Sequence, residues 1–106
     1  MNKSKAKGTT FETLVVNFFK RRGFPHVERR ALFGHLDRGD IAGVPGVVIE
    51  CKAEQRIDLA GYMDQVVKEV GNASAEMGVA IVKRRNHSVE RAYVVMELQQ
   101  FVRWLQ

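Results

Sequence analysis

The sequence predicts an α/β domain in which helices flank a central mixed β-sheet of about five strands. Two short apolar runs, Val47–Ile49 and Val79–Val82, are rich in β-branched residues, which is typical of buried strands. A long helical pattern separates the two runs, and a connecting helix favours a parallel pair of strands. The expected order is a helix, three strands, a helix, two strands and a last helix. With 106 residues, 45% of them hydrophobic, we expect one domain over residues 1–106.

The charge of the chain indicates the kind of partner. A net charge of +5 at pH 7 favours a polyanion such as nucleic acid. The alternative is that each basic cluster is a solvated face. We expect no membrane association, because no stretch approaches the ~20 apolar residues of a membrane span. One cysteine cannot form an internal disulfide, which is compatible with a cytoplasmic location. The basic clusters are Lys3–Lys7, Lys20–Arg22, Arg29–Arg30 and Lys83–Arg85.

The amino-terminal part predicts a flexible basic arm over residues 1–7 and then a helix from about Thr9 to Arg22. Its apolar residues recur with helical spacing, which predicts a core-facing stripe. Gly23 is the expected residue after the helix end. Thr9 to Glu12 match a capping box, in which Glu12 would bond back to the Thr9 amide. The stripe consists of Phe11, Leu14, Val15, Phe18 and Phe19.

Charged side chains interrupt the apolar strand pattern at one place. Val47–Ile49 leads into Glu50 and Lys52, whose side chains share a face because strand residues alternate, while Cys51 points away. A three-residue loop, Val44–Gly46, would set Asp40 directly opposite Glu50. A bulge on either strand would have the same effect. The alternative is a surface hairpin with solvated charges, in which Glu50 and Lys52 form an ordinary ion pair.

This set of residues suits phosphodiester hydrolysis. Two carboxylates, Asp40 and Glu50, supply hard oxygen ligands for Mg²⁺, with Mn²⁺ as a possible substitute. The ion lowers the pKa of a bound water and clamps phosphate oxygens. The ammonium of Lys52 can orient the water or stabilise charge on the phosphorus. Since the Cys51 side chain points away, its backbone carbonyl is the group that can reach the ion.

The segment before this hairpin predicts a strand and a loop. Residues Pro25–Phe33 read as the first strand, and Gly34–Arg38 as a loop that carries His35 and Asp37. Either side chain can touch DNA or lie near the metal, and a solvated loop is the alternative. Asp40 is preferred over Asp37 as the ligand, because Asp40 directly precedes an apolar strand pattern.

The second half predicts a long helix that Asp58 caps and Gly78 ends. Gln65 lies about 120° from the apolar stripe of this helix, which is typical of an exposed residue. Further on, Ala92–Met96 is the last expected strand, and a final helix begins after Glu97 with Trp104 off its apolar face. The stripe of the long helix consists of Leu59, Met63, Val66, Val67, Val70, Ala73 and Met77.

Asp40 followed by Glu50-Cys51-Lys52 resembles the catalytic core of the PD-(D/E)xK nuclease superfamily. Lys7-Gly8 followed by Glu12 resembles the amino-terminal motif of its archaeal-type Holliday junction resolvases, which also occur in viruses. The element order is similar over nearly the whole chain, although Gly39 replaces the proline of the superfamily's name. The resemblance implies a restriction-endonuclease-like fold and a homodimer, in the host cytoplasm if the chain is viral. It also implies that Glu12 contributes to the metal site and that Gln65 lies near it; helix capping stays an equal alternative for Glu12.

The sequence thus predicts a Mg²⁺-dependent DNA endonuclease, with a Holliday junction resolvase as the favoured form. One alternative is another nuclease of the superfamily that acts on flaps or duplex DNA. The other is a nucleic-acid-binding module without catalysis. The expected partner is branched or duplex DNA, and the final helix with Trp104 is the expected dimer interface. The residues expected to contact DNA are Lys7, Arg29, Arg30, Arg38, Lys83, Arg84 and Arg85.

Overall fold

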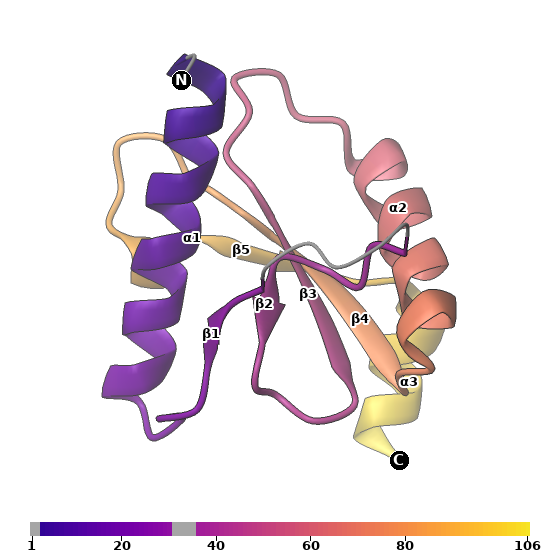
Figure 1. The fold of residues 1–106 in the computed structure, drawn as a ribbon. Helices are drawn as coiled ribbons and strands as arrows, with labels where there is room; N and C mark the ends of the chain where they lie inside the picture. Colours follow the sequence, from indigo (N-terminus) through magenta and orange to yellow (C-terminus); the bar gives the residue numbers. More distant parts are fainter. Residues whose placement is uncertain (1–2, 31–35) are drawn as a thin grey trace.

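The computed structural model describes residues 3–30 and 36–106, with the side chains of residues 3–5 left aside. A five-stranded sheet in the order β1-β2-β3-β4-β5 lies between α1 on one face and α2 with α3 on the other (Figure 1). The α/β fold with a mixed, helix-flanked sheet is therefore confirmed. The elements are α1 (Lys3–Arg21), β1 (Glu28–Arg29), β2 (Ile41–Ala42), β3 (Val47–Lys52), α2 (Leu59–Ala73), β4 (Met77–Val82), a 3₁₀ turn (Val89–Arg91), β5 (Tyr93–Val95) and α3 (Leu98–Leu105).

The two central strands are β3 and β4, which pair in parallel from Val47↔Met77 to Lys52↔Val82. The other neighbouring pairs are antiparallel. The helix α2 makes the crossover between β3 and β4, as the apolar runs predicted. As a result, the carboxyl ends of β3 and β4 and the amino-terminal end of α1 lie at one end of the molecule, at the top of Figure 1.

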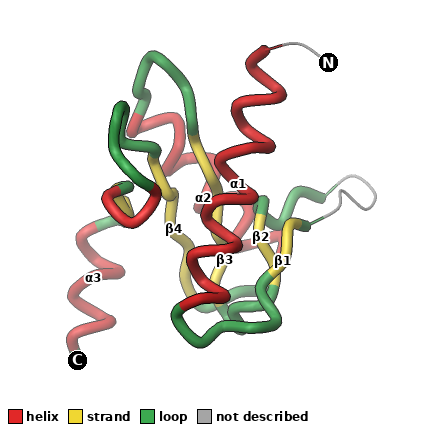
Figure 2. Tube along the Cα trace, turned by 90° about the vertical axis from the view of Figure 1, so that its left-hand side faces the viewer, coloured by secondary structure: helices red, strands yellow, loops and turns green. Residues whose placement is uncertain are grey.

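The helix α1 begins earlier than predicted. It starts at Lys3, so a flexible arm over residues 1–7 is wrong for residues 3–7, and Thr9 lies inside the helix rather than at its cap. The end is as predicted: Gly23 has a φ of +96°, and Phe24 N donates to Phe19 O at 3.1 Å. This is the bonding of a glycine-terminated helix. Figure 2 shows α1 crossing in front of the sheet.

The core on the α1 face is formed by alternate strand residues and one edge of the helix. Ile49 and Cys51 of β3 pack with Phe11 and Val15 of α1. The predicted stripe is wrong at Leu14, which is 44% exposed, whereas Val16 is buried. The side of α1 that packs on the sheet is therefore rotated slightly from the side predicted by the spacing of its apolar residues.

The helix α2 departs further from prediction. Asp58 caps it as expected, since its Oδ1 accepts from Gly61 N at 3.0 Å, but the helix ends at Ala73 and Ser74 adopts the left-handed conformation. Gly78 does not end α2; it lies in β4, where a Cβ atom would come within 2.6 Å of the Val66 and Val70 side chains. The close approach of α2 to β4 requires glycine there.

The sheet-facing side of α2 coincides only in part with the predicted stripe: Val66 is buried and Met63 and Val70 pack against the same core. Its buried residues are Tyr62, Val66 and Glu69, while Leu59 and Val67 are about half exposed. Some apolar residues of α2 pack against the sheet and others face α3. A single stripe therefore does not predict which residues meet the sheet. This rotation carries Gln65 and Glu69 towards the sheet.

The first and last elements also differ from expectation. Within the described residues, β1 covers Glu28–Arg29 rather than Pro25–Phe33. Every residue of α3 is at least partly exposed and none is buried, so the apolar face expected on this helix does not enter the core. Among the described residues, no helix has the length and hydropathy required to cross a membrane.

Candidate active site

The hairpin of β2 and β3 places Asp40 beside Glu50 as predicted. Ile41 pairs with Ile49 across the loop Val44–Gly46, which is the register that the three-residue loop requires. Asp40 then bonds to β3 on both sides of Glu50: its amide donates to Ile49 O at 2.8 Å, and its Oδ2 accepts from Cys51 N at 2.8 Å. The carboxylate of Asp40 takes the place of a ladder carbonyl and is fixed against β3.

Glu50 and Lys52 lie on the α2 face of β3, and Cys51 points to the opposite core. The Lys52 Nζ atom lies 3.6 Å from Glu50 Oε2 and donates to Gln65 Oε1 at 2.7 Å. The Gln65 amide in turn donates to Glu50 Oε2 at 3.2 Å. The structure therefore joins Glu50, Lys52 and Gln65 in one hydrogen-bonded group, so Gln65 lies beside these residues, as the resemblance implied, and the alternative of an exposed Gln65 is wrong.

One acidic residue of this group was missed by the sequence analysis. Glu69 is buried on α2, and Gln65 Nε2 lies 3.4 Å from its Oε2. The two residues are four positions apart, so they share a helix face. That spacing was the available signal, but Glu69 resembles any charged helix residue until the rotation of α2 is known.

Asp37 also reaches this group, from the loop before β2. An oxygen of Asp37, one of Glu50 and one of Glu69 all lie within 4.8 Å of one another. Asp37 is positioned by two contacts: Gly39 N donates to its Oδ1 at 2.9 Å, and Asn72 Nδ2 donates to its carbonyl at 2.9 Å. The sequence analysis placed Asp37 near the metal as one possibility and preferred Asp40. His35 lies outside the described residues.

Burial sets the protonation of the two glutamates. Burial raises the pKa of Glu50 well above 4.5, the charges of Asp40 and Glu69 raise it further, and Lys52 opposes them. Burial also raises the pKa of Glu69, with a smaller contribution from Asp37. Among the described residues, Glu50 Oε1 and Glu69 Oε1 have no hydrogen-bond partner. A buried carboxylate without a partner is unfavourable, so this pair takes up a proton or a cation.

Glu12 lies on α1, apart from this bonded group. Its Oε1 accepts from Arg29 Nε at 3.1 Å, so its side chain contacts β1 rather than the Thr9 amide, and the capping box is wrong. Partial burial raises the pKa of Glu12, and the negative charge of Asp40 adds to the rise. The charges of Glu12 and Asp40 therefore repel each other.

The residues expected to contact DNA are spread over several elements. Lys7 is exposed near the start of α1, Arg30 is exposed after β1, and Arg29 pairs with Glu12. Arg38 is exposed in the segment before β2. Lys83 follows β4 directly and its amide donates to Lys52 O at 2.9 Å, so the segment Lys83–Arg85 begins beside the carboxyl end of β3.

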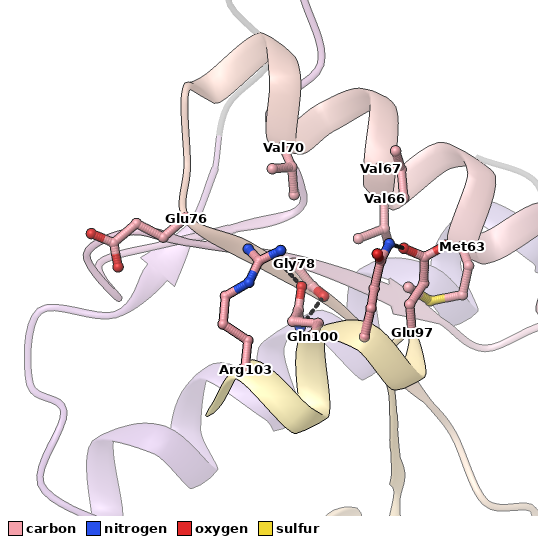
Figure 3. A pocket seen from close by; sticks show the side chains of 10 residues that line it. Met63, Val66, Val67, Val70, Glu76, Gly78, Glu97, Gln100 and Arg103 are labelled. Carbon is pink, nitrogen blue, oxygen red and sulfur yellow. Dashed lines mark hydrogen bonds between the residues drawn. The ribbon is translucent and has the colours of Figure 1, made fainter. Parts of the chain in front are cut away.

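A separate pocket with both apolar and polar walls lies between α2 and α3. This cavity of about 150 Å³ is lined by Met63, Val67 and Val70 of α2 and by Gln100 and Arg103 of α3, among others (Figure 3). The Gln100 side chain bonds to both backbone groups of Gly78 at 3.0 Å, which fixes α3 to β4. Within the described part of the chain, no predicted site residue lines the pocket, so it is distinct from the carboxylate group.

The chain was compared with models of protein families, with curated proteins and with solved structures, and none of them matches it. The geometry of these side chains is therefore the basis for assigning a function.

Proposed function

We propose that this protein is a metal-dependent endonuclease that hydrolyses phosphodiester bonds in DNA, with the four-way junction as its favoured substrate. One observation carries the proposal: Asp40 bonds to β3 on both sides of Glu50 while Gln65 holds Lys52 beside Glu50. Two carboxylates and an ammonium are thereby fixed on one surface by backbone and side-chain bonds. A solvated surface hairpin would not bury Glu50 to 2% exposure.

The donor set fits Mg²⁺. Asp40 uses Oδ2 for the Cys51 amide and retains Oδ1, and Glu50 has a buried Oε1 without a partner among the described residues. Carboxylate and carbonyl oxygens are the ligands that Mg²⁺ prefers. Asp40, Glu50 and the Cys51 carbonyl would hold the ion, and Glu12 would assist, since its charge and that of Asp40 interact. When bound, Mg²⁺ supplies charge neutralisation on the phosphate and lowers the pKa of water.

The side chains of the chain itself have separate tasks. Lys52 presents a positive charge to the phosphate or to the attacking water. Charge stabilisation of this kind lowers the reaction barrier most when the charged group is already held in place before the reaction. Gln65 provides that hold through its bond to Nζ at 2.7 Å, which fixes the ammonium beside Glu50. Gln65 thus acts through Lys52 as a positioning residue.

The basic residues near this site support a DNA partner. Lys83–Arg85 lies next to the carboxyl end of β3, at the same end of the molecule as the start of α1 (Figure 1). A phosphate backbone that crosses this end would meet positive charge from both segments. These contacts are sequence-independent, which suits an enzyme that recognises DNA shape.

A four-way junction requires two symmetric cuts, and one chain supplies one set of Asp40, Glu50 and Lys52. A twofold dimer supplies two sets through a self-complementary patch. The helix α3 is our choice for that patch, because Leu98, Trp104 and Leu105 are 66–75% exposed on it. Val94 of β5 adds further exposed apolar surface.

A substrate panel tests this function. Four-way junction, flap and linear duplex DNA are each incubated with the protein in Mg²⁺ and in EDTA. The proposal expects Mg²⁺-dependent cleavage, fastest on the junction. Faster cleavage of the flap or duplex would make the protein a different nuclease. Binding without cleavage of all three substrates in Mg²⁺ would make it a binding module.

A further inference from the structure

Three carboxylates from three separate elements converge at one point beside the proposed site. Asp37 comes from the loop before β2, Glu50 from β3 and Glu69 from α2, and one oxygen of each lies within 4.8 Å of the others. We call these residues the acidic triad. Asp37 and Glu69 have no part in the function proposed above, so their position needs its own explanation.

Two of the three carboxylates in the acidic triad are buried, which points to a ligand there. The side chains of Glu50 and Glu69 are 2% and 1% exposed, and the Oε1 atom of each has no hydrogen-bond partner among the described residues. Leaving a buried carboxylate unpaired is among the costlier features a fold can carry. Lys52 is the neighbouring cation, but its ammonium is engaged by Glu50 and Gln65. A second positive charge would compensate Glu69 and Asp37.

The acidic triad is also held in place by its surroundings. Asn72 and the Gly39 amide fix Asp37, and Gln65 Nε2 lies between Glu50 and Glu69. Such supporting bonds orient carboxylates for a metal ion. Their spacing suits a divalent cation: ligand distances of about 2.3–2.6 Å for Ca²⁺ accommodate oxygens that lie within 4.8 Å of one another, and about 2.0–2.1 Å for Mg²⁺ requires them to draw slightly closer.

We propose that Asp37, Glu50 and Glu69 hold a second divalent cation, which shares Glu50 with the ion assigned above to Asp40 and Glu50. That this ion is the second of two rests on the proposed function, whereas the acidic triad stands on its own geometry. A second ion there would supply further charge neutralisation to a phosphate held at the site.

Counting bound Mn²⁺ tests the proposal without DNA. The full chain is titrated with Mn²⁺, and free Mn²⁺ is measured by electron paramagnetic resonance. The wild type should bind two ions per chain. Glu69→Gln and Asp40→Asn should each bind one, and Asp37→Asn should weaken one site at least about tenfold. Asp64→Asn is the matched control, because it removes an exposed carboxylate from the same helix, and it should bind two.

The outcomes separate this inference from the proposed function. If folded Glu69→Gln and Asp37→Asn bind Mn²⁺ as the wild type does, the acidic triad is not a metal site, even if the wild type cleaves DNA. If Glu69→Gln loses one ion but the wild type cleaves none of the panel, the acidic triad stands and the nuclease function falls. Circular dichroism checks the fold of each variant. Asp37 lies in a loop, so Asp37→Asn tests the site if Glu69→Gln does not fold.

Discussion

At the scale of single residues, the site is a set of carboxylates whose charge is controlled by burial. Glu50 lies in a buried strand, at a position where an apolar side chain is usual. Its charge is not fully compensated, because the Lys52 ammonium lies 3.6 Å away and also donates to Gln65. Glu69 is buried next to it. Buried, incompletely satisfied polar groups are uncommon in native proteins and mark functional positions.

The first prediction concerns catalysis. Asp40→Asn, Glu50→Gln and Lys52→Ala should each lower the rate of junction cleavage by at least about 100-fold, the usual loss when a charge-stabilising group is removed. Glu50→Gln should stay folded, because its raised pKa means that the folded protein already tolerates a neutral group there. Single-turnover cleavage and thermal melting measure the two effects.

Junction binding in EDTA is the control for these variants, and it should survive because it depends on the basic residues. Wild-type cleavage by folded Glu50→Gln would remove the proposed mechanism.

The second prediction concerns pH. Burial raises the pKa of Glu69 from 4.5 to about 7, and the pKa of Glu50 is raised as well. Both carboxyl groups hold their protons more tightly in the folded state than in the unfolded state. The protonated groups therefore stabilise the fold fully below pH 4.5, and this stabilisation is lost as pH rises through their folded-state pKa values. In EDTA, the free energy of unfolding should fall between about pH 4.5 and 7 as Glu69 loses its proton, and should fall further above pH 7 as Glu50 loses its own, by up to about 1.4 kcal/mol per pH unit for each carboxyl group.

Urea titrations at several pH values measure this dependence. Glu69→Gln should flatten the fall, and Asp64→Asn on the same helix should leave it unchanged. Equal pH dependence in Glu69→Gln and the wild type would contradict the assignment.

At the scale of elements, α2 decides which side chains reach the site. It buries Tyr62, Val66 and Glu69 against the sheet and turns Met63 and Val67 towards α3. Gly78 permits this packing, because any side chain there would collide with Val66 and Val70. The same helix thus supplies apolar packing to two neighbours and the polar groups Gln65 and Glu69 to the site.

The third prediction concerns the segment after β4. Replacing Lys83, Arg84 and Arg85 by Ala should reduce the slope of log affinity against log salt by about 0.9 for each DNA phosphate that the variant no longer neutralises. The physical reason is that fewer counterions are released from DNA. Fluorescence anisotropy with labelled junction DNA, between low and moderate salt, measures the slope.

The matched control is the triple change of Lys20, Arg21 and Arg22 to Ala. These residues also carry three positive charges, but they lie at the opposite end of α1 (Figure 1). The control should alter the slope less. If both triple variants alter it equally, the binding surface is not the end that carries Lys83–Arg85.

At the scale of the whole molecule, the apolar surface is unevenly distributed. Leu98, Trp104 and Leu105 of α3 stand largely exposed, although α3 is anchored to β4 through Gln100 and packs beside the cavity next to α2 (Figure 3). Trp104 lies against Phe101, with ring centroids 6.1 Å apart. A clustered apolar surface with an aromatic pair is typical of an interface.

The fourth prediction is a homodimer through α3. Light scattering should report about twice the 12.0 kDa chain mass, because a twofold contact would cover the exposed side chains of α3. Trp104→Ala should weaken the dimer and uncouple the two cuts in a junction. Ile57→Ala, which removes an exposed apolar side chain from the β3–α2 connection, should leave the dimer intact. A monomer that makes paired cuts would exclude this arrangement.

Local pattern was sufficient for much of the fold. The β-branched runs identified β3 and β4, the intervening helix implied their parallel pairing, and the loop Val44–Gly46 gave the register that brings Asp40 to Glu50. Alternation along β3 also placed Glu50 and Lys52 on one face. These features follow from alternation along a strand and from the order and connection of neighbouring elements, so the sequence by itself determined them.

Other features were decided by tertiary packing. Which side of α2 faces the sheet depends on α3 and on the space at Gly78, and this choice buried Glu69 and brought Gln65 to Lys52. Glu12 accepts a hydrogen bond from Arg29, 17 residues away, instead of forming the expected local cap. Helical periodicity shows that a helix has an apolar side but not which neighbour each edge will meet, because that is fixed by contacts between residues far apart in the chain.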